Sequence, residues 1–191
     1  MRSAGSLSSP LYVALMHYPV TDKNGATIAS AVTNLDLHDI ARVARTYGVR
    51  RYYVVTPLED QVVLVNRILD HWVAGVGGTY NPDRRLALQL VRVAATFEAA
   101  LAEIAHAEGR RPKTVATTAR RPAGNLSFAQ LRRMCDGPTP IVVALGTAWG
   151  LTDAFLDAAD HVLDPLAGRN GYNHLSVRSA AAIILDRLTR N

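Results

Sequence analysis

The stretch IVVALGTAWGL, residues 141–151, is the part of the sequence that is most informative about the fold. Its first five residues are all aliphatic, a pattern that is typical of a strand buried on both faces of a parallel sheet. Gly146 and Gly150 follow, and glycine allows the backbone both to turn tightly and to approach a ligand closely. This stretch therefore predicts a central strand whose carboxyl end is a candidate binding site.

Strand-like segments alternate with helical ones on both sides of this stretch. Short apolar or β-branched runs predict further strands at residues 11–16, 51–56, 88–93, 114–118 and 161–166. Apolar residues at helical spacing predict helices at residues 36–47, 62–74, 97–107, 127–134 and 175–188. This alternation is typical of an α/β fold, in which helices cover both faces of a parallel sheet.

Length and composition favour one cytoplasmic domain. The chain has 191 residues, and we expect a single domain at residues 11–191 after a flexible tail at residues 1–10. The tail lacks the hydrophobic segment of a signal peptide, and no apolar run reaches the roughly 20 residues that span a bilayer. One cysteine, Cys135, and six scattered histidines show no metal-ligand spacing. We therefore expect a soluble cytoplasmic protein with no membrane segment, no disulfide and no metal.

The charge of the chain points to a polyanionic partner. The formal net charge is +5, and all but two of the 21 basic residues are arginines. Arginine doublets occur at residues 50–51, 84–85, 110–111, 120–121 and 132–133. A guanidinium group suits a phosphate well, although most such doublets are simply solvated surface. The charge is therefore compatible with nucleic-acid binding without establishing it.

Three loops in the last part of the chain are expected to meet at one edge of the sheet. They follow Thr118, Leu145 and Leu166, each at the carboxyl end of a predicted strand. In open parallel sheets, ligands bind where such loops converge. The chain has neither a Gly-x-Gly-x-x-Gly motif nor a Gly-Lys-Ser/Thr loop, which disfavours classical dinucleotide binding and P-loop phosphoryl transfer.

These stretches together resemble the SPOUT superfamily of S-adenosylmethionine-dependent RNA methyltransferases, in particular a stand-alone bacterial branch. The resemblance lies in VALGTAWGL (residues 143–151), HVLDPLAGRNGYNHLS (161–176) and SVRSAAAIILDRL (176–188). In addition, DLHDIARVARTYGV (36–49) is similar to the first motif of the SpoU/TrmH branch, in which an arginine precedes an aromatic-Gly-Val. In this chain that arginine is Arg42.

The resemblance implies a fold, a cofactor and an assembly that periodicity alone does not suggest. The family fold is an α/β sheet whose C-terminal segment forms a deep trefoil knot. The methyl donor S-adenosylmethionine is held in the knot, and the first and last helices form a homodimer whose interface completes the active site. The expected activity is methylation of tRNA or rRNA. The donor contacts expected here are Thr118, Leu145, Gly146, Thr147, Gly150, Leu151, Leu163, Leu166, Tyr172, Asn173 and Leu175.

The resemblance leaves the catalytic groups and the acceptor atom open. Arg42 is the candidate catalytic residue; because arginine is a poor base, binding of substrate phosphate and electrostatic stabilisation are its more plausible roles. Two positions depart from the SpoU/TrmH pattern, since Asp36 and Val177 stand where that branch has asparagines. Either a ribose 2′-hydroxyl or a base nitrogen therefore remains possible as the acceptor. The candidate proton acceptors are Asp22, Asp153, Asp164 and His174.

Two other readings remain open. The chain could be a non-catalytic RNA-binding or scaffold dimer that keeps the fold, in which case it would bind the donor weakly or not at all. It could also be an unknotted α/β enzyme that acts on a small nucleotide or phosphate substrate. If RNA is the substrate, we expect the arginines at 120–121 and 132–133 to hold phosphates. Trp149 could stack on a base, although a tryptophan at such a position more often packs in the core or at an interface.

Overall fold

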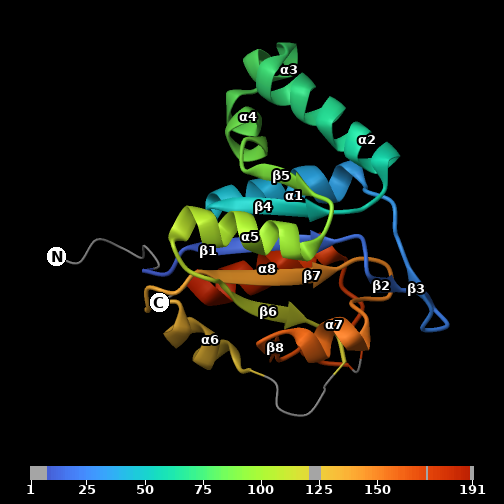
Figure 1. The fold of residues 1–191 in the computed structure, drawn as a ribbon, viewed down its shortest axis with the longest axis vertical. Coiled ribbons are helices and arrows are strands. Elements are labelled where there is room, and N and C mark those ends of the chain that lie inside the picture. The colour runs from blue at the N-terminus through green and yellow to red at the C-terminus, as the bar shows by residue number, and fades with distance from the viewer. Residues whose placement is uncertain (1–7, 121–125, 171, 190–191) are drawn as a thin grey trace.

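The computed structural model describes residues 8–120, 126–170 and 172–189. Its centre is a sheet of six parallel strands in the order β5-β4-β1-β7-β6-β8 (Figure 1). The strands are β1 (Leu11–Met16), β4 (Arg51–Val55), β5 (Val91–Ala94), β6 (Lys113–Thr117), β7 (Ile141–Gly146) and β8 (His161–Leu163). The predicted α/β fold with a parallel sheet is confirmed.

The two central strands, β1 and β7, determine where a ligand can bind. They pair in parallel, from Leu11 opposite Ile141 to Met16 opposite Gly146. The chain leaves β1 toward β4 on one side, whereas it leaves β7 toward β8 on the other side. The loops that follow β1 and β7 therefore diverge, and such a switch point is where open α/β sheets bind ligands.

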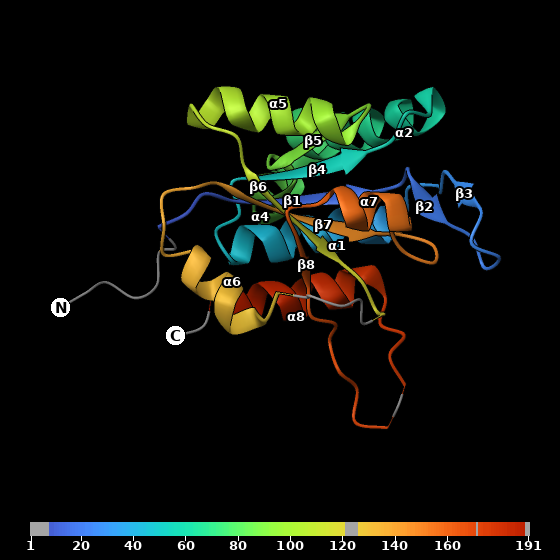
Figure 2. The ribbon, with the colours of Figure 1, turned by 60° about the horizontal axis from the view of Figure 1, so that its bottom comes forward.

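Helices cover both faces of the sheet (Figure 2). One face carries α1 (Asn34–Thr46), α6 (Phe128–Met134) and α8 (Val177–Thr189), and α1 and α6 both pack on α8. The other face carries α5 (Phe97–Glu108) and α7 (Asp153–Ala158), which contact the sheet at β4, β5 and β6. No helix among the described residues has the length and apolar character needed to cross a membrane.

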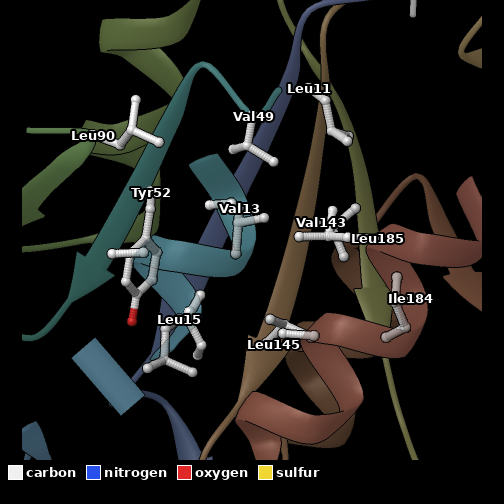
Figure 3. Packing of buried hydrophobic residues seen from close by; sticks show 14 of the residues in the cluster. Leu11, Val13, Leu15, Val49, Tyr52, Leu90, Val143, Leu145, Ile184 and Leu185 are labelled. Carbon is white, nitrogen blue, oxygen red and sulfur yellow. The ribbon is translucent and has the colours of Figure 1, made fainter. Parts of the chain in front are cut away.

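Alternating side chains of the central strands form a hydrophobic core on each face. Leu11, Val13 and Leu15 of β1 point into the larger core, and Ile184 and Leu185 of α8 lie in the same core beside β7 (Figure 3). The intervening residues of β1 point into the second core, under α5 and α7. Since full burial of such a side chain stabilises the fold by about 1.5–3 kcal/mol, both faces hold the helices firmly against the sheet. This two-sided burial explains the continuous apolar runs in the sequence.

The segment between β4 and β5 differs from the prediction. It consists of α2 (Glu59–Leu69), a π-helical segment (Asp70–Ala74), α3 (Val76–Tyr80) and α4 (Pro82–Leu88), and α2 and α3 project beyond the sheet (Figure 1). The predicted strand at 88–93 therefore begins only at Val91. The reason is local: Asn81 caps a helix by accepting a hydrogen bond from the Arg84 N–H, and Pro82 occupies the first helical position. Together they turn the apolar residues near Leu88 into the end of a helix.

Three smaller features also lie outside the predicted elements. A hairpin of β2 (Val20–Thr21) and β3 (Thr27–Ile28) occupies the predicted loop after β1, and α7 was not predicted. The last strand ends at Leu163 rather than at residue 166. Residues 1–7 of the expected tail lie outside the described residues, and Ser9 is buried, with its N–H donating to the Cys135 carbonyl oxygen at 2.9 Å.

Candidate functional site

A cavity of about 590 Å³ opens at the carboxyl ends of the central strands. Its walls come from five segments that lie far apart in the sequence, at residues 30–36, 117–120, 145–151, 163–166 and 173–184. This volume falls within the range of pockets that enclose small organic ligands, roughly 300–1,000 Å³. The cavity therefore stands where the strand order predicts a ligand site, and it is large enough for a nucleoside-sized molecule.

The loop after β7 lines this cavity with residues 145–151. A Cβ atom on Gly146 would stand only 2.6 Å from the Leu151 nitrogen, so no larger residue fits there without moving the loop. Ala148 and Gly150 adopt left-handed conformations, with φ of +50° and +103°, and the Gly150 N–H donates to the Thr147 carbonyl oxygen at 2.9 Å. The turn is therefore tight, and its conformation favours glycine at positions 146 and 150.

A chain of buried hydroxyl groups ties this loop to β1. The Thr147 hydroxyl donates to the Met16 carbonyl oxygen at 2.9 Å, and the Ser30 hydroxyl lies 2.5 Å from Thr147 Oγ1. Because Thr147 has already used its one proton, Ser30 must donate to it, and Ser30 Oγ must then accept from Nδ1 of His17 at 3.1 Å. These contacts hold the segment after β1 against the loop after β7.

His17 is a neutral member of this chain. It is fully buried, and burial lowers the pKa of its imidazole to about 4, against an ordinary value of 6.5. Its Nε2 is buried without a hydrogen-bond partner among the described residues. A proton on Nδ1 leaves Nε2 as an unprotonated acceptor, so the hydrogen bonds and the lowered pKa agree on the neutral form.

The β2–β3 hairpin holds the same loop from its outer side. The Trp149 N–H donates to the Thr21 carbonyl oxygen at 3.1 Å, and the Thr21 N–H donates to the Gly150 carbonyl oxygen at 2.9 Å. The Trp149 side chain itself is 66% exposed at the rim. The loop is thus fixed by β1 on one side and by the hairpin on the other, while an aromatic ring remains free at the entrance.

The C-terminal segment forms the wall that faces the loop. The side-chain amide of Asn173 donates to the Ala119 carbonyl oxygen at 3.0 Å, which connects this segment to the chain after β6. A Cβ on Gly168 would lie 2.1 Å from the Tyr172 carbonyl oxygen, so glycine is required where this connection returns on itself. The connection between β8 and α8 extends away from the sheet before it returns (Figure 2).

One buried carboxylate lines the cavity. Asp36, in the first turn of α1, is 7% exposed; it accepts from the Thr33 hydroxyl at 2.6 Å and from Arg178 of α8 at 3.2 Å. From the sequence, Asp36 stands out only as a departure from a family motif, and neither it nor Ser30 or Thr33 is predicted to belong to the site. Their position just after a central strand, at the start of a helix, is the signal that could have identified them.

The cavity gathers most of the predicted donor contacts. All of them line it except Tyr172, whose ring is 71% exposed and lies 5.5 Å from the ring of His174. Arg42 does not line the cavity; it lies in a second hollow, between α1 and α4. The structure thus separates the predicted catalytic arginine from the predicted donor contacts of the same chain.

The candidate proton acceptors divide in the same way. Asp164 and His174 line the cavity. Asp22 instead accepts backbone hydrogen bonds from Asn24 and Ala26 within the hairpin turn, and Asp153 forms an exposed ion pair with Arg120 at 2.6 Å. Within the described ranges, no group of three histidine, cysteine or acidic side chains is arranged to hold a metal ion.

A family model described as SAM-dependent RNA methyltransferase matches residues 10–190. The chain belongs to this family. A protein of Aquifex aeolicus is 38% identical over 183 residues, which cover 95% of this chain and 89% of that protein. Two proteins named tRNA (guanine-N(1)-)-methyltransferase, from Oleidesulfovibrio alaskensis and Nitratidesulfovibrio vulgaris, are 47% and 46% identical over 93% of this chain. The chain spans only 41% of the length of these two relatives.

Solved structures of the same fold are much more distant in sequence. A probable methyltransferase from Bordetella pertussis superimposes with a TM-score of 0.61 at 17% identity, covering 96% of both chains. A TrmH/SpoU tRNA modifying enzyme from A. aeolicus gives a TM-score of 0.53 at 14% identity, covering 97% of this chain and 75% of that one. The predicted relationship to the SPOUT methyltransferases is therefore confirmed, by the family model in sequence and by these neighbours in fold.

Proposed function

We propose that this protein transfers a methyl group from S-adenosylmethionine to RNA, with the donor bound in the cavity at the carboxyl ends of the central strands. The observation that carries the proposal is the 590 Å³ cavity at the carboxyl ends of the central strands, which is lined by the tight loop at 145–151, where Gly146 has no space for a Cβ. Membership of a SAM-dependent RNA methyltransferase family supports the same ligand. Peptide groups of such a loop can bind the edge of an adenine ring.

The residues of the cavity would bind and align the two substrates. Bound S-adenosylmethionine supplies a methyl group that its sulfonium has already activated, so no metal is required. Backbone groups of residues 145–151 and 163–166 would hold the adenine edge, and Leu145, Leu163 and Leu166 would cover its faces. Alignment of donor and acceptor then provides most of the acceleration.

Removal of the acceptor proton would fall to a polar group that lines the cavity. Asp36, Asp164 and His174 meet this condition, whereas Asp22 and Asp153 lie outside the lining. Arg42 does not line the cavity of its own chain. This division favours a role for Arg42 in holding RNA, as expected from its chemistry.

We also infer that the C-terminal segment forms the expected trefoil knot. Two observations support this. Leu126 pairs with the outer edge of β8, so β8 lies between β6 and Leu126. The chain enters β8 from α7 on one face of the sheet and continues to α8 on the other face. A change of faces between two earlier parts of the chain is compatible with the knot that the family resemblance implies.

A homodimer is the assembly that we propose. The first and last helices, α1 and α8, pack on each other, and the apolar side chain of Leu35 on α1 remains 61% exposed. An exposed leucine beside the paired helices is compatible with a second copy at this position. Light scattering coupled to size exclusion should give twice the mass of one chain; a monomeric mass would contradict the proposal.

The RNA and the acceptor atom are proposed at a coarser level. The relatives named for guanine N1 methylation of tRNA make tRNA the first substrate to test, but the chain corresponds to only 41% of their length. Three proton-accepting groups line the cavity. Methylation of a base nitrogen or of a ribose hydroxyl releases a proton in either case, so these groups favour catalysis over RNA binding alone.

Donor binding tests the proposal directly. Isothermal titration calorimetry should show S-adenosylmethionine binding to the wild type, and Leu175→Arg, which places a charged chain in the cavity wall, should weaken it at least about tenfold. Leu64→Arg is the matched control. Leu64 on α2 is 40% exposed, much like Leu175 at 47%, but it does not line the cavity. Absence of donor binding by the wild type would refute the proposal.

RNA methylation is the second half of the test. Labelled donor should transfer its methyl group to tRNA or rRNA isolated from a strain that lacks the gene, and mass spectrometry of the nucleosides identifies the product. Donor binding without any methylated nucleoside would favour the alternative of a non-catalytic RNA-binding or scaffold dimer.

A further inference from the structure

A second hollow, of about 390 Å³, lies between α1 and α4, outside the lining of the donor cavity. Its polar residues are Arg42, Arg45, Thr46, Asn81, Asp83 and Arg84. We refer to it as the arginine hollow. Three guanidinium groups face a single carboxylate there, which leaves the hollow with a net positive charge.

The arginines of this hollow are available to a ligand. No ion pair between Arg42, Arg45 or Arg84 and a carboxylate is found among the described residues, whereas Arg178 and Arg50 both have acidic partners. The side-chain Nε of Arg84 is buried and has no hydrogen-bond partner within the same ranges. An arginine that is partly buried without a counter-charge is poorly satisfied by the protein alone, so an anion at this position would complete its contacts.

Arg84 is also held in an orientation that suits a phosphate. Its guanidinium carbon lies 4.6 Å from the centre of the Trp72 ring. A guanidinium that stacks on an aromatic face keeps its N–H groups directed outward in its own plane, where they can contact two phosphate oxygens. Nearby, burial lowers the pKa of His38, and the charges of Arg84 and Arg42 lower it further, against the opposing charge of Asp39.

The position of the hollow links it to the donor cavity through α1. Asp36, in the first turn of that helix, lines the cavity, while Arg42 and Arg45 lie six and nine residues further along. At 1.5 Å per residue these positions are roughly 9–14 Å further along the helix axis.

We propose that the arginine hollow binds backbone phosphates of the RNA strand whose target nucleotide enters the donor cavity. This inference rests on the proposed function, because it assigns a contact to the same substrate. It gives Arg45, Arg84 and Trp72 a role that the donor cavity does not require. The contact positions the strand and carries no sequence information.

The test compares two double variants with the same change in charge. Arg45→Gln/Arg84→Gln removes two guanidinium groups from the hollow, and Arg110→Gln/Arg111→Gln removes two exposed ones just before β6, at the opposite edge of the sheet. Filter binding with tRNA from a strain that lacks the gene is measured at several salt concentrations. We expect the hollow variant to bind about tenfold or more weakly and to lose roughly 1.5–2 from its salt slope, and the control to change less than about threefold.

Further measurements separate folding and small anions from RNA binding. Both variants should bind S-adenosylmethionine like the wild type, and Arg45→Gln alone, at an exposed position, should lower the salt slope by about 0.7–0.9 without affecting the Arg84–Trp72 stack. Inorganic phosphate should bind the wild type weakly and the hollow variant not at all. Phosphate binding combined with unchanged RNA affinity of the hollow variant would assign the hollow to a free anion and overturn the proposal.

Two outcomes distinguish this inference from the proposed function. If the wild type methylates RNA and the hollow variant binds RNA as well as the control does, the hollow assignment alone is wrong. If the wild type binds the donor but neither binds nor methylates RNA, the proposed function itself fails. Polyglutamate, an anionic polymer, can also be tested as a competitor of RNA binding. If it displaces RNA equally well from both double variants, the hollow is likewise excluded as the anion site.

Discussion

The donor cavity and the arginine hollow lie at the two ends of α1 and are built from different parts of the chain. Backbone groups and buried hydroxyls form the cavity, in which Thr147 and Ser30 bond to each other and to β1. Side chains form the hollow, where Arg42 and Arg45 project from an exposed helix face. The cavity is thus continuous with the core of the sheet, whereas the hollow is an addition to the surface.

This difference predicts how each site responds to substitution. Buried polar groups must be paired, so a change in the cavity wall affects binding and folding together. Exposed guanidinium groups such as those of Arg42 and Arg45 contribute little to folding, so their loss should affect binding far more than stability. Three pairs of variants test this contrast, each with one member at the cavity and one in the hollow or near it on α1.

The largest effect is expected for glycine. Gly146→Ala places a Cβ 2.6 Å from the Leu151 nitrogen and should both abolish measurable donor binding and lower the free energy of unfolding by about 2–3 kcal/mol. Gly48→Ala, at the end of α1, meets no atom within 4 Å but has a φ of +71°, so it should lower stability by only about 1 kcal/mol. Urea denaturation and calorimetry measure both quantities. Equal donor affinity in the two variants would remove the distinction between the regions.

The second contrast concerns pH. Because the pKa of His17 is about 4 in the folded protein and 6.5 in the unfolded chain, the unfolded state takes up a proton first as the pH falls. The free energy of unfolding should therefore decrease between about pH 6.5 and pH 4, by up to about 3 kcal/mol from this group, and be independent of His17 above pH 7.5.

Two histidine variants measure this loss. His17→Gln should remove most of the decrease in the free energy of unfolding that His17 causes at low pH. His38→Gln, beside the hollow, should remove a smaller decrease, because His38 is only partly buried. Denaturation of each variant at pH 4.5 and pH 7.5 provides the comparison. A wild type whose stability falls no more than that of His17→Gln would show that His17 is protonated in the folded protein.

The smallest effect is expected for threonine. Thr147→Val removes the donor to Met16 and leaves the Ser30 hydroxyl without its acceptor, which should lower the free energy of unfolding by about 1–2 kcal/mol and weaken donor binding. Thr46→Val in the hollow removes only an exposed hydrogen bond to the Arg42 carbonyl oxygen and should change stability by less than about 0.5 kcal/mol. Indistinguishable thermal denaturation of the two variants would contradict a coupled cavity wall.

The sequence predicts the donor cavity better than the hollow, for a physical reason. The residues after β6, β7 and β8 follow buried strands, and the carboxyl ends of parallel strands share one edge of the sheet. Any correct set of strands therefore brings Thr118, Leu145 and Leu166 together. Asp36 and Ser30 were not predicted to belong to the cavity, because no strand pattern identifies the far end of the irregular segment after β1.

The sequence does not predict the hollow, because the hollow depends on α4, whose apolar residues also fit a strand. Residues near Leu88 are compatible with a strand or with the end of a helix, and the Asn81 cap decides for the helix. Only then does Arg84 lie beside Arg42 and Arg45. The distance of Arg42 from the donor cavity likewise depends on how α1 crosses the sheet, which the spacing along one helix does not encode.

By itself, the sequence determined the parallel α/β sheet and the three loops at its carboxyl edge, because burial periodicity and turn chemistry act between residues that are close along the chain. The family came from the resemblance of a few stretches to known proteins. Tertiary structure alone decided which polar groups face the cavity and which arginines share a hollow. Such neighbours, for example His17 with Thr147 or Arg45 with Arg84, come together only through packing of distant segments, and no local pattern records that packing.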